Sequence, residues 1–105
     1  MEDKLRKASK DGRVEEVKEI LRDHGAIIDV NQSTGEEDGC LVAIHFACMF
    51  GHDSIVSLLL AHPDIDVNIK NYMRSTPFLI ACYNCRTSCV RLLLKDSRVK
   101  VNEPH

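Results

Sequence analysis

Apolar residues in this chain recur in short stretches, and the pattern of these stretches is itself repeated at a fixed distance. The three leucines at 58–60 recur at 92–94, and the Ala-Cys pair at 47–48 recurs at 81–82, in each case 34 residues later. A fixed period of this length predicts stacked supersecondary units, each of which covers the apolar face of its neighbour. An elongated stack exposes a long surface and encloses no deep pocket, so the pattern favours a binding protein.

A fainter copy of the unit lies upstream, at a distance of 39 residues instead of 34. Two of the additional residues fall between Leu21 and Asn31, in the loop expected after the second helix, and the other three fall in the polar stretch 32–40. Helices in a stack must keep their register while loops need not, so we expect the length variation to be confined to loops. The matching positions are Ala8, Gly12, Val17 and Leu21, which precede Ala47, Gly51, Val56 and Leu60.

Local signals within the last unit predict two short antiparallel helices. Thr76 and Pro77 indicate a helix start, because Thr accepts a hydrogen bond from a free backbone N–H and Pro loses nothing at the first helical position. This helix is expected to run to about Asn84. Thr87 and Ser88 are then expected to cap the second helix, which carries its apolar residues at helical spacing.

The second and third units resemble the ankyrin repeat. The third unit has Thr-Pro-Phe-Leu-Ile-Ala at 76–81, Val-Arg-Leu-Leu-Leu at 90–94 and Val-Asn at 101–102, and the second has His-Phe-Ala at 45–47 and Gly-His at 51–52. The resemblance covers almost the whole chain. It implies an all-α solenoid of stacked helix-turn-helix units with projecting β-turn fingers. It also implies one domain over 1–105, with a degenerate capping repeat 1 at about 1–31, repeat 2 at about 32–68 and repeat 3 at about 69–102.

The chain departs from the family pattern at three places. Repeat 2 has Val42 where the family has the Thr of Thr-Pro, and repeat 3 has Leu79 where the family has His, so neither repeat carries the full side-chain network between fingers. Cys85 occupies the position of a turn Gly. A side chain at positive φ costs about 1 kcal/mol or more, so we expect repeat 3 to be the softer one.

Composition narrows the class of protein. The chain is 44% hydrophobic but has only two Tyr, three Phe and no Trp, so we expect an aliphatic core. No apolar run approaches the roughly 20 residues that span a bilayer, and the charged stretch 1–10 does not resemble a secretory signal. Five cysteines without such a signal predict reduced thiols, in the cytoplasm or the nucleus.

Charge is distributed unevenly along the chain. Residues 32–68 hold six Asp or Glu and no Lys or Arg, while residues 69–105 hold seven Lys or Arg and two Asp or Glu. One interpretation is that adjacent units attract one another and their faces are simply solvated. The other is a polarised surface that steers a charged partner. We do not expect nucleic acid as the partner, because the basic part lacks interleaved aromatic residues, zinc-finger spacing or a Gly-rich loop.

Some Cys and His residues are candidates for zinc binding, redox chemistry or catalysis, but a structural role explains the same residues better. A zinc or redox cluster could be assembled from three cysteines near other Cys and His, but Cys48 and Cys82 follow the Ala of the repeat, where a thiol behaves as a small hydrophobe. Cys85 is the thiol expected in a turn, yet no base or oxyanion site accompanies it. His45 is expected to form structural hydrogen bonds. We therefore expect no enzyme activity, no cofactor and no small-molecule substrate. The cluster residues considered are Cys82, Cys85, Cys89, His45, Cys48 and His52.

The resemblance implies a site for a protein partner on the concave surface, formed by the fingers and by the residues before the helix turns. Exposed aromatic and Met side chains without a core role are typical of an interface centre. We expect charges around Glu36 on one side and Arg74 and Arg86 on the other. Alternatively, Met49 and Phe50 pack against the neighbouring repeat. The predicted contact residues are Glu37, Asp38, Leu41, Met49, Phe50, Tyr72, Met73, Arg74, Ser75, Tyr83 and Asn84, with Lys10 and Asp11 matching in repeat 1.

Two further expectations follow from the family. The chain ends where the next finger of an ankyrin array would begin, so it is expected to be the N-terminal piece of a longer array. An alternative function is therefore that of a capping segment without a ligand of its own.

Asn68 and Asn102 each follow a Leu by eight residues, the spacing found in substrates of an asparagine hydroxylase, whereas Asn31 follows Leu21 by ten. Both asparagines are therefore predicted modification sites.

Overall fold

A computed structural model of the chain describes residues 1–101, and within them the fold is a stack of helix pairs without β-strands. The all-α prediction is therefore confirmed. A short 3-10 helix, η1 (Glu36–Asp38), lies in the finger between the first two pairs. The pairs are α1 (Glu2–Asp11) with α2 (Val14–His24), α3 (Ala43–Phe50) with α4 (Asp53–Leu60), and α5 (Pro77–Tyr83) with α6 (Thr87–Lys95).

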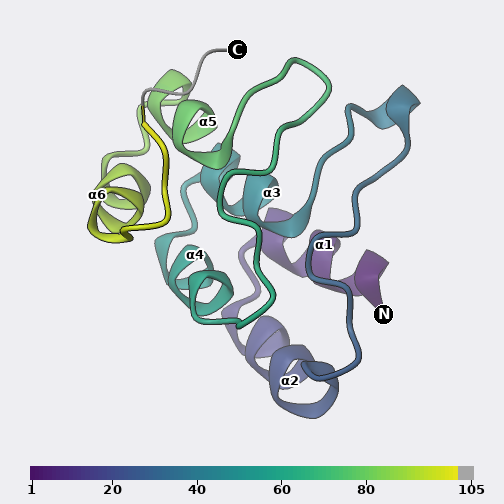
Figure 1. Cartoon of the computed structure of the whole chain (residues 1–105). Helices are drawn as coiled ribbons and strands as arrows, with labels where there is room; N and C mark the ends of the chain where they lie inside the picture. Colours follow the sequence, from purple (N-terminus) through teal and green to yellow (C-terminus); the bar gives the residue numbers. More distant parts are fainter. Residues whose placement is uncertain (102–105) are drawn as a thin grey trace.

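The helices form two layers (Figure 1). Helix α3 contacts both α1 and α5 and makes the inner layer with them, while α4 contacts both α2 and α6 in the outer layer. The two fingers project beyond the inner layer on the side away from α2, α4 and α6. None of the helices described in residues 1–101 is long and apolar enough to cross a membrane.

The core between the layers is aliphatic, as the composition predicts. Each helix turns one apolar stripe inward, and these side chains are removed from water almost completely. Among residues 1–101, His45 is the one aromatic ring in the set of large, fully buried side chains. The largest fully buried side chains are Leu5, Ile44, Ile55, Leu59, Leu93, His45, Val17, Val30, Val42, Val56, Pro77 and Cys48.

The turn inside each helix pair has a residue in the left-handed conformation. Gly12 and Gly51 have φ of 77° and 75°, and Cys85 has φ of 56° at the matching place. In every case the next residue donates its N–H to the carbonyl of the inner-helix Ala, as Arg86 does to Ala81 at 2.8 Å. Cys85 therefore adopts the glycine conformation predicted for it and lacks the freedom of glycine to do so.

Helix starts follow the local signals only in part. Thr76 caps α5, since its Oγ1 accepts the N–H of Leu79 at 3.3 Å, and Pro77 is the first helical residue. The prediction that Thr87 or Ser88 caps α6 is wrong, because the helix already begins at Thr87 and Arg86 precedes it without a side-chain cap. Arg86 occupies the N-cap position, and its guanidinium has no atom that can accept a backbone N–H.

The additional residues of repeat 1 lengthen a helix as well as loops. Leu21 and Leu60 are equivalent, yet α2 continues to His24 whereas α4 ends at Leu60. The expectation that the variation is confined to loops is therefore wrong for α2. The polar stretch 32–40, in contrast, forms a finger that contains η1, in agreement with an insertion in a loop.

Asparagine side chains join the loops of successive repeats. Asn31 donates from Nδ2 to the carbonyl of Asp64 at 2.7 Å and accepts the N–H of Asp66 with Oδ1 at 2.8 Å. Asn68 makes the same two bonds, both at 2.8 Å, to the loop at 98–100. The longer segment before Asn31 therefore leaves its position in the stack unchanged. Asn102, the next residue in this series, lies outside the described residues.

Candidate functional site

A groove of about 470 Å³ lies between the second finger and the C-terminal ends of α3 and α5. Asn71 and Ile80 line it without having been predicted, and Ile80 is buried. A groove with thioether and aromatic walls suits the burial of an apolar side chain from a partner. Five predicted contact residues also line the groove: Met49, Met73, Ser75, Tyr83 and Asn84.

Asn71 shapes the finger that forms one wall of the groove. Its Oδ1 accepts the N–H groups of Met73 and Ser75, each at 2.9 Å, and its own N–H donates to the carbonyl of Ser75 at 3.0 Å. Arg74 at the tip has φ of 62°, which this tight turn requires. An Asn that begins a polar turn commonly bonds to the backbone two residues later, and this signal could have identified Asn71 from the sequence.

Four exposed large side chains lie near the groove or on the second finger. Tyr72, Met73 and Tyr83 are 66%, 69% and 62% exposed. Phe50, at the end of α3, is 40% exposed, whereas Met49 is half-buried and packs against the core. Packing against the neighbouring repeat, the alternative considered for both residues, therefore describes Met49 better than Phe50.

Several predicted residues are buried, are engaged in another hydrogen bond, or lie outside the groove. Ser75 is only 5% exposed, so it belongs to the buried wall of the groove and not to an outward surface. Arg86, expected at a charged rim, is half-buried and donates from Nε to the carbonyl of Met49 at 3.0 Å. The residues that do not line the groove are Glu37 and Asp38 on η1, half-buried Leu41, Phe50, and Tyr72 and Arg74 on the second finger, together with Lys10 and Asp11 at the end of α1.

A backbone hydrogen bond joins the two fingers. The N–H of Tyr72 donates to the carbonyl of Gly39 at 2.9 Å, which links the second finger to the residues that follow η1. Thr34 braces the first finger, because its backbone N–H donates to the carbonyl of Leu41 and its Oγ1 accepts the N–H of Leu41. These bonds fix the fingers before any partner binds, and an ordered surface loses less conformational entropy on association.

His45 has the structural role expected of it. Its Nδ1 accepts the N–H of Val42 at 3.1 Å, and its Nε2 lies 2.8 Å from the carbonyl of Ile69, a geometry that needs a neutral ring protonated on Nε2. Burial holds the pKa of His45 below its ordinary value, although the hydrogen bond to Ile69 opposes this shift. The ring therefore binds the backbone N–H of Val42, the residue that precedes α3, and fastens the start of the second finger to this helix.

The cysteine thiols are all free. Cys48 and Cys89 are both fully buried and share a hydrogen bond between α3 and α6. This bond, together with burial, raises the pKa of Cys48 well above its usual value, so this thiol is a poor nucleophile. Within residues 1–101 no three His, Cys, Asp or Glu side chains lie close enough together to hold a metal ion, so the Cys and His set considered above is not brought together.

Comparison with known proteins agrees with this architecture. The family model of ankyrin repeats matches residues 5–104 in three copies. The chain belongs to the ankyrin repeat family. The ankyrin repeat domain of human ASB11 is similar in structure, with a TM-score of 0.72 and 27% identity over 87% of this chain and 38% of that one. Ankyrin repeats are in general protein–protein interaction modules.

Two curated relatives of this ankyrin chain are much longer than the region they share with it. Ankyrin repeat and LEM domain-containing protein 2 of Rattus norvegicus is 33% identical over 66 residues, which make up 63% of this chain and 7% of that protein. I-Kappa-B like protein C2 of Microplitis demolitor bracovirus (isolate Webb) is 34% identical over 68 residues, or 65% of this chain and 36% of that protein. The ankyrin chain thus spans well under two thirds of either relative.

Proposed function

We propose that this ankyrin domain is a non-catalytic scaffold that binds a protein partner through its concave finger and inner-helix surface. The observation that carries the proposal is the exposure of Tyr72, Met73 and Tyr83 beside the groove, while the aliphatic core is complete without them. Water-exposed side chains of this size contribute nothing to the core. Their burial against a partner is a source of binding free energy.

The arrangement resembles the centre and rim of a protein interface. The centre is the groove, where a partner side chain would contact Met49, Ile80 and Tyr83. Truncation of one central anchor is expected to weaken binding by about 2 kcal/mol or more. Glu37 and Arg74, on the two fingers, would instead change the association rate and its salt dependence, because rim charges mainly steer the encounter.

A photo-crosslinking experiment tests the location of the site. A photoreactive amino acid at Met73 should capture a protein partner from cells, and Tyr83→Ala should reduce the yield of that same adduct. The matched control places the crosslinker at Ile27, an apolar residue in the loop after α2 that is 82% exposed. Adducts that form equally well at Ile27, or that survive Tyr83→Ala, would place the binding surface elsewhere.

A second candidate function is that of a capping segment in a larger ankyrin array, without a ligand of its own. It is favoured by Leu94, an apolar residue of α6 that is 58% exposed. In that case the crosslinker at Met73 should give no specific adduct.

The free state of all five cysteines supports a reducing compartment, so we place the protein in the cytoplasm or the nucleus.

A further inference from the structure

Two thiols are in direct contact where repeat 2 packs against repeat 3. Cys48 on α3 and Cys89 on α6 are both fully buried, and their side chains share a hydrogen bond. The two residues are far apart in the sequence, so the stacking of the repeats brings their sulfur atoms together. Neither thiol is part of a disulfide. A pair of thiols in contact is the arrangement that a two-electron oxidant converts into a disulfide.

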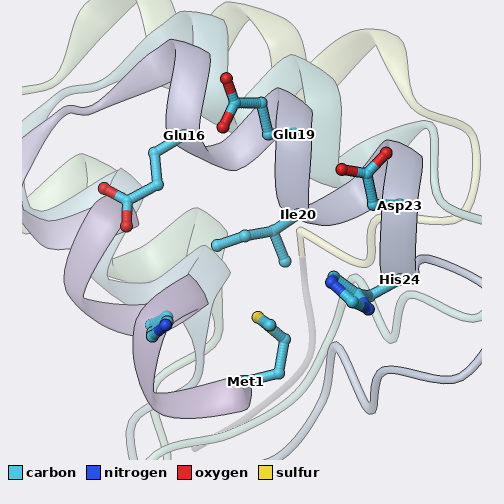
Figure 2. A pocket seen from close by; sticks show the side chains of 7 residues that line it. Met1, Glu16, Glu19, Ile20, Asp23 and His24 are labelled. Carbon is cyan, nitrogen blue, oxygen red and sulfur yellow. The ribbon is translucent and has the colours of Figure 1, made fainter.

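The same positions carry other residues at the preceding boundary of the stack. Ser9 in repeat 1 corresponds to Cys48, and Ile55 in repeat 2 corresponds to Cys89. In repeat 1 the residue that corresponds to Cys89 is Glu16, which Figure 2 shows on α2 at the edge of a pocket of about 210 Å³. A hydroxyl, an aliphatic chain and a carboxylate are thus all accommodated at these positions, so the packing of a repeat does not itself require a thiol.

A small pocket lies beside Cys89 and gives an oxidant a place to bind. Its volume is about 150 Å³, and Cys89 lines it together with Gly51, Arg86, Thr87 and Ser88. One water molecule needs about 10 to 15 Å³ of such space, so the pocket has room for hydrogen peroxide, a molecule of only two oxygen atoms. The pocket lies between the turn of repeat 2 and the start of α6, next to the pair of thiols.

The surroundings of Cys89 favour its thiolate. The hydrogen bond with Cys48 lowers the pKa of Cys89, and the positive charge of Arg86 acts in the same direction, against burial and the carboxylate of Asp53. The same hydrogen bond and burial raise the pKa of Cys48. Because the thiolate is the form that attacks an oxidant, Cys89 is the residue that reacts first, while Cys48 retains its proton.

We propose that Cys89 and Cys48 form a peroxide-sensitive dithiol that closes a disulfide between repeats 2 and 3. The sulfur of Cys89 attacks one oxygen of hydrogen peroxide, the O–O bond breaks, and the other oxygen leaves as hydroxide and takes up a proton to become water. Cys89 is then a sulfenic acid. The sulfur of Cys48 attacks the sulfur of Cys89, the S–O bond breaks, and the hydroxyl group leaves with the Cys48 proton as a second water. Two thiols and one peroxide thus give one disulfide and two waters.

The disulfide would fasten repeat 3 to the rest of the stack. The loop that it closes contains α4, the second finger and α5, and repeat 3 otherwise packs on repeat 2 through α5 on α3 and α6 on α4. Repeat 3 also contains the strained turn at Cys85. In a reducing compartment the disulfide is transient, because thiol reductants open it again. This modification does not depend on the function proposed for the groove.

Peptide mapping after exposure of the whole chain to hydrogen peroxide tests the pairing. Trypsin releases Cys89 in the peptide 87–91 and Cys48 in the peptide 23–70, which also contains Cys40. We expect these two peptides to be linked before reduction and separate after treatment with dithiothreitol. A variant with Ser in place of Cys40, Cys82 and Cys85 retains Cys48 and Cys89 alone, and it should give the same linked pair.

Thermal unfolding of the same variant measures the effect on the stack. Peroxide should raise its melting temperature by at least about 5 °C, and dithiothreitol should reverse the gain. Cys48→Ser in this background is the matched control, since Ser9 shows that the stack accepts Ser at this position, and peroxide should not raise its melting temperature. In this control the sulfenic acid of Cys89 lacks its partner, so dimedone should label the peptide 87–91.

Three results would overturn the proposal. The first is oxidation of the exposed Cys82 and Cys85 in the natural chain while Cys48 and Cys89 stay reduced. The second is a linked pair of peptides without a rise in the melting temperature, which would exclude a stabilising link between the repeats. The third is dimedone labelling of Cys48 in a Cys89→Ser variant, with no labelling of Cys89 in Cys48→Ser, which would exclude Cys89 as the thiol that attacks peroxide.

Discussion

The Nε of Arg86 donates a hydrogen bond to the main-chain oxygen of Met49 at 3.0 Å. His52 has the same relationship one repeat earlier, with its Nε2 3.0 Å from the main-chain oxygen of Lys10. Each of these side chains therefore binds the C-terminal end of the preceding inner helix. Arg86 also lies directly over a turn, since a Cβ on Gly51 would be 2.8 Å from its Cδ. The turn glycine thus permits both the positive φ and the close approach of the next repeat.

The third turn has Cys85 in place of this glycine, with φ of 56° and an exposed side chain. We expect Cys85→Gly to raise the free energy of unfolding by about 1 kcal/mol, because the left-handed conformation strains any residue with a Cβ. Urea unfolding measures the change. Cys85→Ala removes the thiol but retains the strain, so it should have little effect. An equal gain from both variants would show that the thiol, and not the backbone, is responsible.

Ser9 lies in the inner layer at the position equivalent to Cys48. It is fully buried, and its hydroxyl has no hydrogen-bond partner among the described residues. A buried polar group without a partner is destabilising, so Ser9→Ala and Ser9→Cys should each raise the free energy of unfolding by about 1 kcal/mol. Ser54→Ala, at an exposed position on α4, is the control and should change little. Destabilisation by both Ser9 variants would contradict the unpaired state of the hydroxyl.

His45 should make stability depend on pH. Its pKa is lowered in the folded protein by burial, while the unfolded chain has a His pKa of about 6.5. The unfolded state therefore binds the proton first, so this contribution is fully present above about pH 6.5 and is lost as the pH falls through the folded-state pKa. Protonation also removes the Nδ1 acceptor used by Val42.

Urea unfolding at several pH values between about 5 and 7.5 measures this dependence. His45→Gln is less stable at neutral pH but carries no titrating ring, so its stability should fall less steeply as the pH is lowered. The same slope in His45→Gln and in the unaltered protein would assign the pH dependence to other groups.

At the concave surface, the residues that matter for binding should differ from those that matter for stability. Tyr72→Ala and Tyr83→Ala should leave the melting temperature almost unchanged, because both side chains are largely exposed. Ile80→Ala, in the buried wall of the same groove, should lower stability by about 2 to 5 kcal/mol. Thermal unfolding followed by circular dichroism distinguishes the two classes. Unfolding caused by either Tyr substitution would mean that these residues support the stack and are not held ready for a partner.

Hydroxylation by an asparagine hydroxylase is predicted at Asn68 and Asn102 and not at Asn31. Asn31 is a stringent internal control, because it forms the same pair of inter-repeat bonds as Asn68 but follows its Leu at a different spacing. Mass spectrometry after incubation with the enzyme should find a gain of one oxygen on peptides with Asn68 or Asn102. Modification at Asn31 as well would show that the Leu spacing does not select the site, and no gain at either predicted residue would refute the prediction.

Part of the candidate site could be predicted from the sequence, because the position of a residue within a repeat indicates whether its side chain belongs to the core. Met49, Met73, Tyr83 and Asn84 do line one groove. Ser75 is buried despite its finger position, because Asn71 folds the turn back over its own backbone. That closure depends on a side-chain hydrogen bond within one turn, and a comparison of repeats contains no signal for it.

The sequence by itself determined the helix pairs, their order and the aliphatic core, because the 34-residue period and the helical spacing act within each repeat. Only the tertiary structure decided which side chains face solvent at the ends of the stack. Val56 and Val90 occupy identical positions in the repeat, yet α6 covers the first, while the second remains partly exposed on the outer side of α6. Burial of a repeat position depends on what packs beside it, and in a solenoid that neighbour is supplied by residues a full period away.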